Sequence, residues 1–458
     1  MTHEPVAAPP RPDDVPRLAE QLSYVGGEFA SNFAWNMVAG FLLFYYTDVA
    51  LLPVAALGAL MLGSRLLDAI IDPVVGVAVD RTETRWGKAL PYLLFAPLPF
   101  GVLCVLTFTV PDWTPTAKVI YAYVTFTLLG LCYSLVYIPC GALQPMMVRD
   151  PAIKQRIGSW RAMATSVASI AVYSSVMPIV ALAGPQNRMR GFTLAATIVS
   201  AISVALYFIV FRNCRERFKS AEGKRHSPMR RDIGRLARNP VWLLAFLYAL
   251  ISFVRIGGVV SVTAYFANTV LRNPGLIGII LPLLSIAILS GGFIASLTFV
   301  RFGMKRMNIV FLGISVACML VMPYLEHSNV ALLTMFTAAN VSGGIIAATI
   351  FITVANSVEY NERRFGDRNE GLLFSGVSFG MKVGMALGSA ATAFLLAWAG
   401  YDPKAHAPMA VTTIRALFYY VPAVLTFAQA LFLWYFPDGA TAAVGASLAP
   451  ASANGDRQ

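Results

Sequence analysis

The sequence contains few charged residues and very little histidine. Asp, Glu, Lys and Arg make up 13% of its 458 residues and hydrophobic residues 57%, whereas about 25% of the residues of a soluble globular chain are charged. The phosphate-binding pattern G-x-x-x-x-G-K-S/T does not occur. The four histidines fall in expected tails or loops, away from any buried metal cluster or nucleophile: His3, His226, His327 and His406. The sequence therefore argues against a soluble protein, an ATP-driven pump and a histidine-dependent enzyme, and we expect no enzyme.

Cysteine is scarce as well, with five residues in the chain. Four of them fall inside apolar runs. Cys214 falls in the most basic loop, which we expect to face a reducing cytosol. A disulfide framework is therefore not expected.

The apolar residues gather into runs long enough to cross a hydrocarbon core of about 30 Å, which takes roughly 20 helical residues. In the first part of the chain these runs predict six spans, near 22–47, 54–79, 90–110, 117–143, 159–184 and 190–211. They predict six more, near 241–268, 275–299, 308–325, 330–357, 372–398 and 412–436. The predicted fold is an all-α membrane protein of twelve transmembrane helices in two six-helix halves, the major facilitator fold.

Basic residues between the runs predict how the chain crosses the membrane. Residues 212–238 include ten basic and three acidic residues, a net charge of +7, and such a block is cytosolic by the positive-inside rule. We interpret it as a solvated linker that contacts anionic lipid and has no nucleic-acid partner. The expected order is a disordered cytosolic tail, an N-terminal half, a basic linker, a C-terminal half and a second cytosolic tail: 1–20, 21–211, 212–240, 241–436 and 437–458. The protein is then expected in the cell inner membrane, with both termini in the cytosol.

The second span places three charged residues where the hydrocarbon core is expected: Arg65, Asp68 and Asp72. The two acids are four residues apart and share one helical face. Two carboxylates in one dry patch repel, so the pair should either bind a hard monovalent cation or keep one acid protonated. Either outcome makes a site for a coupling ion, Na⁺ or H⁺, and no other cofactor is expected. The alternative is that Arg65 neutralises Asp68 as a structural pair.

Among the other charged residues within predicted spans, four are singled out: Glu28, Arg161, Arg255 and Lys382. A charge at the bilayer centre costs at least about 2.5–3.5 kcal/mol, so each of them is a functional candidate. Arginine suits a bidentate grip on a carboxylate, phosphate or sulfonate, and lysine acts as a point charge. We predict that the three basic residues bind an anionic group of the substrate. Alternatively, they are counter-charges for the acids of the first two spans.

Three segments carry a family resemblance. They read LSYVGGEFASNF in the first span, RLLDAIIDPVVGVAVDRTETRWGK at the second, and EYNERRFGDRNEGLLFS before the eleventh. Together they resemble the glycoside-pentoside-hexuronide cation symporter family, over Leu22 to Trp434. That resemblance implies a major facilitator carrier that moves a sugar or glycoside together with a cation.

The resemblance also implies residue roles. Its cation-site positions are Asp68, Asp72 and Ser134. Asn32 and Tyr137 stand where the family's melibiose carrier has galactoside-binding acids, and Ile71 stands where it has a cation-site Asn. The missing acids favour an acidic, hexuronide-like glycoside. With the charged residues above, the candidate substrate ligands are Glu28, Asn32, Tyr133, Tyr137, Arg161, Arg255 and Lys382.

We therefore predict a secondary active transporter that works as a monomer by alternating access on a small-molecule substrate. The loop after the second span is predicted to latch the cytosolic side or only to set topology: Asp80, Arg81, Arg85 and Lys88. The sequence leaves three other functions open, namely a proton-driven exporter, a lysolipid carrier of the same fold and a transporter-like solute sensor. It does not choose between Na⁺ and H⁺.

Overall fold

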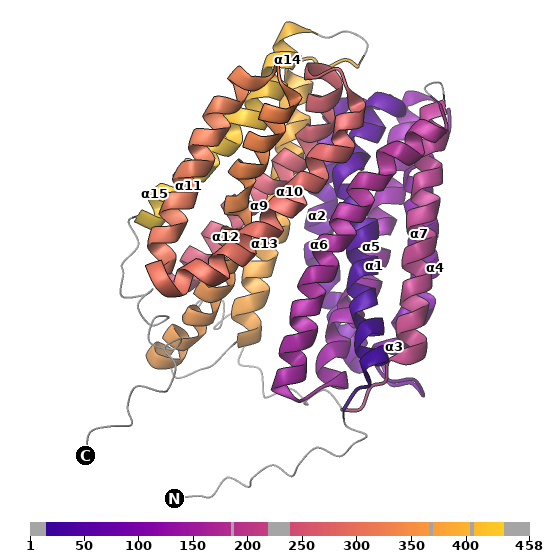
Figure 1. Cartoon of the computed structure of the whole chain (residues 1–458). Coiled ribbons are helices and arrows are strands. Elements are labelled where there is room, and N and C mark those ends of the chain that lie inside the picture. The colour runs from indigo at the N-terminus through magenta and orange to yellow at the C-terminus, as the bar shows by residue number, and fades with distance from the viewer. Residues whose placement is uncertain (1–14, 185–186, 219–238, 366–369, 404–406, 435–458) are drawn as a thin grey trace, which may run out of the picture. The chain divides into compact units, whose positions relative to one another are not determined.

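The structure is a computed structural model that describes residues 15–184, 187–218, 239–365, 370–403 and 407–434. The described residues form α-helices joined by short connections and short 3₁₀ and π turns (Figure 1). The predicted all-helical class is confirmed. Residues 1–14 of the predicted N-terminal tail, the predicted C-terminal tail and most of the basic linker lie outside the described residues. The first helix begins at Leu18, inside the segment 1–20 that was predicted to be disordered.

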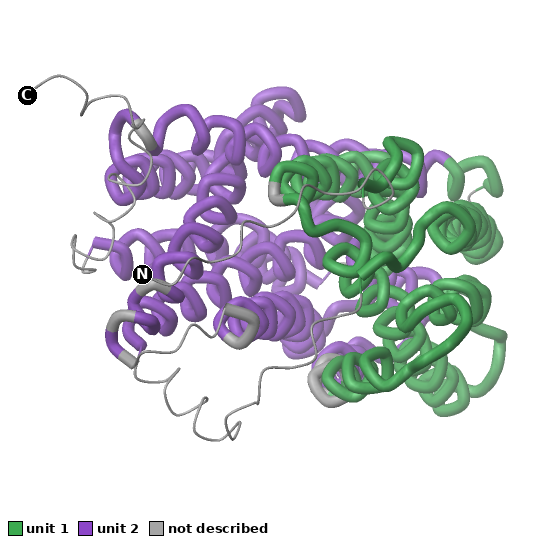
Figure 2. Tube along the Cα trace, turned by 90° about the horizontal axis from the view of Figure 1, so that it is seen from below, with its two compact units in different colours: residues 1–38, 66–172, 179–224 green, residues 39–65, 173–178, 225–458 purple. Residues whose placement is uncertain are grey.

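The chain divides into two compact units, coloured separately in Figure 2. Unit 1 comprises residues 1–38, 66–172 and 179–224, and unit 2 comprises 39–65, 173–178 and 225–458. Three helices pass from one unit into the other: α1 (Leu18–Phe44), α2 (Val54–Arg81) and α6 (Pro151–Leu182). The boundaries of the two sequence halves stay a prediction.

The part of the chain that was predicted to hold the first six spans contains these three helices and four others. The others are α3 (Leu90–Phe95), α4 (Pro97–Thr107), α5 (Pro115–Met147) and α7 (Arg188–Asn213). The predicted third span is thus two helices, because Pro97 has no amide hydrogen to continue the α3 ladder. The helix of the predicted fifth span, α6, begins eight residues before its predicted start. Asp150 caps it by accepting the amides of Ala152 and Ile153.

Unit 2 holds the later helices. They are α9 (Pro240–Tyr265), α10 (Ile277–Phe302), α11 (Met304–Val321), α12 (Asn329–Phe365), α13 (Glu370–Trp398), α14 (Pro408–Arg415) and α15 (Val421–Trp434). A π-helix, Ala416–Tyr420, joins α14 to α15. When α3 and α4 count as one segment, and α14 and α15 as another, the described helices form twelve segments in the predicted order.

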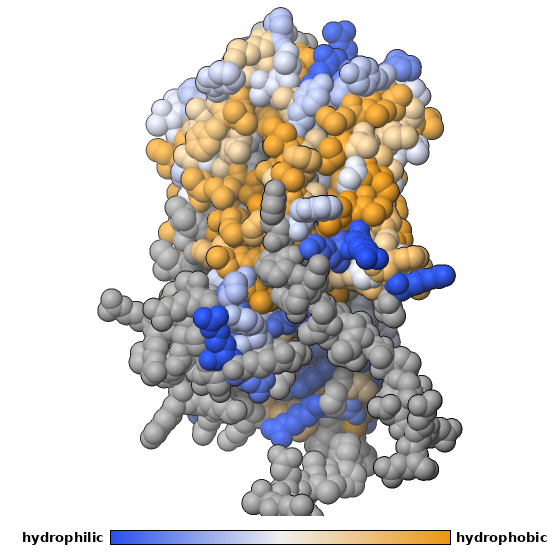
Figure 3. Space-filling model, turned by 90° about the vertical axis from the view of Figure 1, so that its left-hand side faces the viewer, coloured by the Kyte–Doolittle hydropathy of each residue, from blue (hydrophilic) through white to orange (hydrophobic). Residues whose placement is uncertain are grey.

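The protein is a multi-pass membrane protein. Nine helices in the described part of the chain are long and apolar enough to span a bilayer, and two shorter apolar helices, 54–64 and 97–107, accompany them. On the face drawn in Figure 3, hydrophobic residues (orange) cover the middle, and hydrophilic residues (blue) gather toward the top and the bottom. Such a band matches a hydrocarbon layer between two polar surfaces.

The two sets of six helices repeat one local design. α1 and α9 each end in a π-helix, Tyr45–Val49 and Phe266–Val270. A residue with a positive φ follows each of them, Leu51 at 58° and Arg272 at 51°. These turns are 221 residues apart, since 266 − 45 and 272 − 51 give the same number. Non-glycine residues seldom adopt this conformation, so its recurrence at one offset identifies an internal repeat.

Helices α10 and α12 of unit 2 touch through their backbones. A Cβ on Gly344 would collide with the carbonyl oxygen of Ile288, and a Cβ on Gly291 with that of Val341. Small residues at helix crossings allow this approach in membranes, where van der Waals packing drives association. The crossing places Gly343 beside Ile288 and next to the side chain of Arg255.

Candidate functional site

A buried ion pair joins α1 to α6 in unit 1. The Arg161 guanidinium donates to Glu28 Oε2 from Nε at 2.9 Å and from Nη2 at 2.5 Å. The side chains are 11% exposed for Glu28 and 26% for Arg161. Both residues were predicted from the sequence to bind substrate, with the alternative that the arginine is a counter-charge for the acid. The structure brings them together as partners.

Neutral polar groups complete the surroundings of this pair. Asn32, one turn after Glu28 on α1, donates to Glu28 Oε1 at 2.9 Å and to the Thr165 hydroxyl at 3.3 Å. Gln144 on α5 accepts from Arg161 Nη1 at 3.0 Å. The carboxylate of Glu28 therefore receives donors on both oxygens, and the guanidinium is fixed from two helices. The sequence did not single out Thr165 or Gln144, since uncharged polar residues are common in loops and helix interfaces.

The predicted cation site is partly described. Ser134 on α5 donates to Asp72 Oδ1 at 2.6 Å, a short, charge-assisted hydrogen bond. Ser134 is buried, and Asp72 is half-buried one residue before Pro73 inside α2. The side chains of Asp68 and Arg65 lie outside the described residues. The structure thus brings together two of the three predicted cation ligands, which offer carboxylate and hydroxyl oxygens.

Aromatic rings stack beside these polar groups. Tyr133 lies between Trp35, at a centroid distance of 4.4 Å, and Tyr137, at 5.3 Å. Tyr137 lies on α5, three residues after Ser134 and seven residues before Gln144. These spacings place it on the same face of α5 as the partner of Asp72 and the partner of Arg161. Together these residues form one cluster of charged, polar and aromatic groups within unit 1, which we call the unit 1 cluster.

The predicted gating loop is held by a residue that the sequence analysis placed in the linker. Glu216, after α7, accepts the backbone amides of Lys88 at 2.8 Å, Ala89 at 2.7 Å and Leu90 at 3.1 Å. The ammonium of Lys88 donates to the backbone oxygen of Asp80 at 2.8 Å.

The two arginines of the predicted gating loop contact no charged side chain in the described contacts. Arg85 lies over the Trp86 ring, 4.3 Å from its centroid. Arg81 is exposed at the last turn of α2. Of the residues predicted to latch the cytosolic side, Lys88 therefore contacts the backbone of Asp80, and Arg85 contacts an aromatic ring.

Neighbours of Glu216 tie the same segment to α1 and α5. Arg217 donates to both carboxylate oxygens of Glu20, at 2.6 and 2.8 Å. The amides of Arg217 and Phe218 donate to the carbonyl oxygen of Met146. Residues 215–218 therefore connect the start of α1 and the last turn of α5 with the end of α7 and the start of α3. We call them the closing segment.

The two basic candidates of unit 2 differ in exposure. Arg255 on α9 is buried and donates from Nη1 to Asn340 Oδ1 at 3.3 Å. Lys382 on α13 is exposed, and the 221-residue offset makes it the repeat equivalent of Arg161. The position equivalent to Glu28 is Ala249, so an acid occupies this site in the first repeat only.

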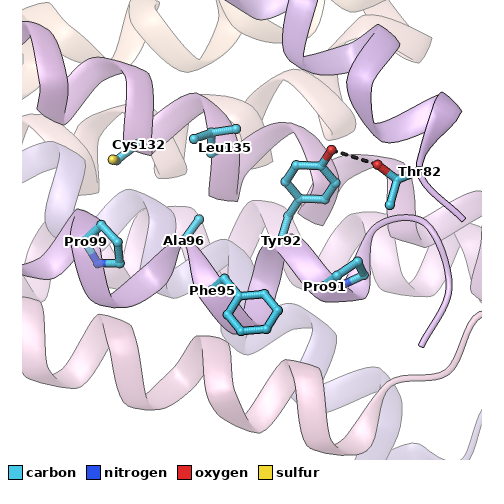
Figure 4. Close-up of a pocket in the computed structure, with 8 residues that line it drawn as sticks. All are labelled: Thr82, Pro91, Tyr92, Phe95, Ala96, Pro99, Cys132 and Leu135. Atoms are coloured by element: carbon cyan, nitrogen blue, oxygen red, sulfur yellow. Dashed lines mark hydrogen bonds between the residues drawn. The ribbon is translucent and has the colours of Figure 1, made fainter. Parts of the chain in front are cut away.

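An apolar groove of about 420 Å³ lies elsewhere in unit 1, between α3, α4 and α5 (Figure 4). At one end the hydroxyls of Thr82 and Tyr92 form a hydrogen bond of 2.8 Å. No charged residue lines the groove, and the other lining residues are Pro91, Phe95, Ala96, Pro99, Cys132 and Leu135. A sugar needs convergent polar groups, so the unit 1 cluster is the better candidate site.

Residues 23–438 match the model of a family described as MFS/sugar transport protein. The chain belongs to the MFS/sugar transport protein family. It is 31% identical over 411 residues to an isoprimeverose transporter of Lactiplantibacillus pentosus, covering 89% of this chain and 86% of the relative. It is 34% identical over 426 residues to a protein named as glycoside/cation symporter YagG of Escherichia coli (strain K12), covering 89% of each.

A solved structure supports the fold. The crystal structure of a D-xylose-proton symporter is similar with a TM-score of 0.66, at 13% sequence identity, covering 91% of this chain and 97% of that one. The predicted family, the major facilitator fold and the prediction of a transporter in place of an enzyme are therefore confirmed.

Proposed function

We propose that this protein couples the movement of a sugar or glycoside to that of a cation, Na⁺ or H⁺, by alternating access. Family membership and the relatives named as sugar transporter and glycoside/cation symporter support this proposal. The observation that carries it is the contact between Asp72 and Ser134 beside the Glu28–Arg161 pair. A carboxylate in a membrane helix is costly, and a coupling ion explains why it is there.

The cation would bind at Asp72 and Ser134, with Asp68 one helical turn away on α2. Carboxylate and hydroxyl oxygens are ligands for a hard cation, and a carboxylate pair can instead share a proton. The 2.6 Å hydrogen bond orients Ser134 toward Asp72. When Na⁺ binds, the hydroxyl would turn its lone pairs to the ion. When H⁺ binds, Asp72 would become the donor.

The substrate would bind at the other end of the unit 1 cluster. Asn32 and Arg161 can hydrogen-bond sugar hydroxyls or a carboxylate, and the stacked rings of Tyr133 and Tyr137 offer a flat apolar surface. Tyr137 shares one face of α5 with Ser134 and Gln144, so the proposed cation and substrate ligands lie along the same helix. Arg255 and Lys382 stay predicted ligands for an acidic group, and a hexuronide-like substrate is the preferred version of the proposal.

Membrane vesicles with an imposed Na⁺ or pH gradient test the coupling. Labelled neutral glycosides and their uronates are supplied at two pH values. We expect Asp72→Asn and Asp68→Asn to abolish gradient-driven accumulation and to leave substrate exchange. Asp112→Asn is the matched control, because the Asp112 side chain is 98% exposed in a loop. Unchanged accumulation in both α2 variants would contradict the proposed cation site.

The same assay separates carriers from sensors. A ligand that binds the protein but never moves with either gradient would favour a transporter-like sensor. We also propose that the protein lies in the cell inner membrane with both termini in the cytosol, because basic residues are concentrated in alternate loops. Protease protection of tags at both ends in right-side-out vesicles checks this orientation, and cleavage of either tag from outside would contradict it.

A further inference from the structure

Arg255 is a buried cation of unit 2 that pairs with no acid among the described residues. It lies in the middle of α9, which spans Pro240–Tyr265, and its residue is 2% exposed. In the described part of the chain, no carboxylate lies within ion-pair distance of it, and its titratable neighbour is Tyr248. Burying an unpaired charge is among the most costly arrangements in a protein, and more so in a membrane.

The hydrogen bonds of Arg255 leave most of its donors unused. A guanidinium has five N–H donors. Its described side-chain hydrogen bond runs from Nη1 to Asn340 Oδ1 and is long, at 3.3 Å. The Nε donor is buried and meets no acceptor among the described residues. The Tyr248 hydroxyl donates to Asn308 Oδ1 at 3.0 Å.

Gly343 lies against the guanidinium. Asn340 and Gly343 are three residues apart on α12 and therefore lie on one face of that helix. A Cβ on Gly343 would lie 3.4 Å from Arg255 Nη2 and 3.1 Å from Ile288 Cγ1, which is a tight fit. This face of α12 therefore approaches Nη2 without a side chain at Gly343, and the acceptor that it offers to the guanidinium in the described structure is Asn340 Oδ1.

We propose that Arg255 and Asn340 form a binding site for a small monovalent anion inside unit 2. The anion would be either a free inorganic ion such as chloride or the carboxylate or sulfonate of a transported solute. It would neutralise the guanidinium, and Arg255 would donate to it from the nitrogens that Asn340 leaves unused. The inorganic form is independent of the proposed transport function, whereas the solute form rests on it.

Thermal unfolding of the purified full chain tests the site without requiring transport. A ligand that binds only the folded protein raises Tm with its concentration. At a hundredfold excess over Kd, the rise is roughly 3 °C for a chain of this size. The probes are chloride, glucuronate and, as a neutral control, glucose. The proteins compared are wild type, Arg255→Met and Arg415→Met. Arg415→Met is the control, because it also removes an arginine from unit 2, one that pairs with Glu326 at 2.6 Å.

Each outcome decides the proposal. A chloride-dependent rise in Tm in wild type and Arg415→Met that disappears in Arg255→Met supports an inorganic anion. A rise with glucuronate alone that likewise needs Arg255 supports an acidic solute. Equal responses of wild type and Arg255→Met to both anions, or no response in any protein, overturn the site and make Arg255 a structural link between α9 and α12.

A second variant decides the case in which Arg255→Met does not fold. Gly343→Ala keeps the arginine and places a methyl group 3.4 Å from its Nη2. We expect it to fold and to weaken the anion response of Tm by at least tenfold in apparent Kd. An unchanged response in Gly343→Ala would overturn the proposed position of the anion. Absence of gradient-driven uptake alongside an Arg255-dependent anion response would refute the transport proposal alone.

Discussion

The Glu28–Arg161 pair gives the most quantitative prediction. Glu28→Gln removes the negative charge but keeps a carbonyl acceptor for Arg161, and Arg161→Met removes the positive charge and keeps much of the volume. Each single change leaves the opposite charge inside unit 1. The double variant removes both charges together, so the three proteins and wild type form a double-mutant cycle.

The structure sets the size of the effect. Removing one partner of a fully buried pair costs about 3–5 kcal/mol, whereas exposed pairs contribute about 0–1 kcal/mol. The exposures of 11% and 26% place this pair between the two. We therefore expect each single variant to lose about 2–3 kcal/mol of stability. The double variant should recover most of that loss, which gives a coupling energy of about 4 kcal/mol.

Two assays are needed, because the double variant is expected to regain stability without regaining transport. Chemical unfolding in detergent measures the coupling energy, and vesicle uptake measures transport. If Glu28 and Arg161 bind substrate, the double variant will be stable and still inactive. Additive losses, with a coupling energy below about 0.5 kcal/mol, would refute the energetic argument. Full recovery of uptake in the double variant would show that the pair is only structural.

Three other predictions concern packing and the closing segment. Glu216→Gln replaces one of the two carboxylate oxygens that accept three backbone amides, and it should speed tryptic cleavage after Arg85 about tenfold. Equal cleavage rates would contradict the role of Glu216 in holding this loop. Burial raises the pKa of the Cys214 thiol, so maleimide labelling, followed by mass spectrometry, should be slow at pH 7 and accelerate as the pH rises toward that pKa. Fast labelling at pH 7 would contradict its burial. Gly344→Ala should destabilise unit 2 by about 1–3 kcal/mol because its Cβ meets the α10 backbone. Gly292→Ala, whose Cβ meets nothing, is the control, and equal melting temperatures would contradict the crossing.

The sequence predicts the helices well because hydrophobic run length is a local property. Run boundaries located the twelve segments, but the break between α3 and α4 at Pro97 was not predicted, because the apolar run continues across it. The early start of α6 was missed because Lys154 and Arg156 suggested a loop, while the cap at Asp150 starts the helix before them. The left-handed turns that follow the two π-helices were missed because leucine and arginine, here Leu51 and Arg272, rarely adopt a positive φ.

The site was predictable in its charges and not in its partners. The cost of a buried charge marks Glu28, Asp72 and Arg161 from the sequence alone. Their pairing depends on which helices pack, and Arg161 is 133 residues from Glu28. Glu216 was missed for the same reason: an acid within a basic stretch resembles solvated linker, and its three amide donors lie more than 120 residues away.

The residues after α7 determine where this polypeptide could be cut into two cooperating chains. A cut at the end of α7, after Asn213, would remove Glu216 and Arg217 from the amides and carboxylate that they bind. The first fragment would then carry an unpaired Glu20 and an unclamped start of α3. A cut after Lys224, where unit 1 ends, would keep the closing segment with its partners. Split versions of this carrier, for complementation or for separate labelling of the two pieces, should therefore keep these residues on the first chain.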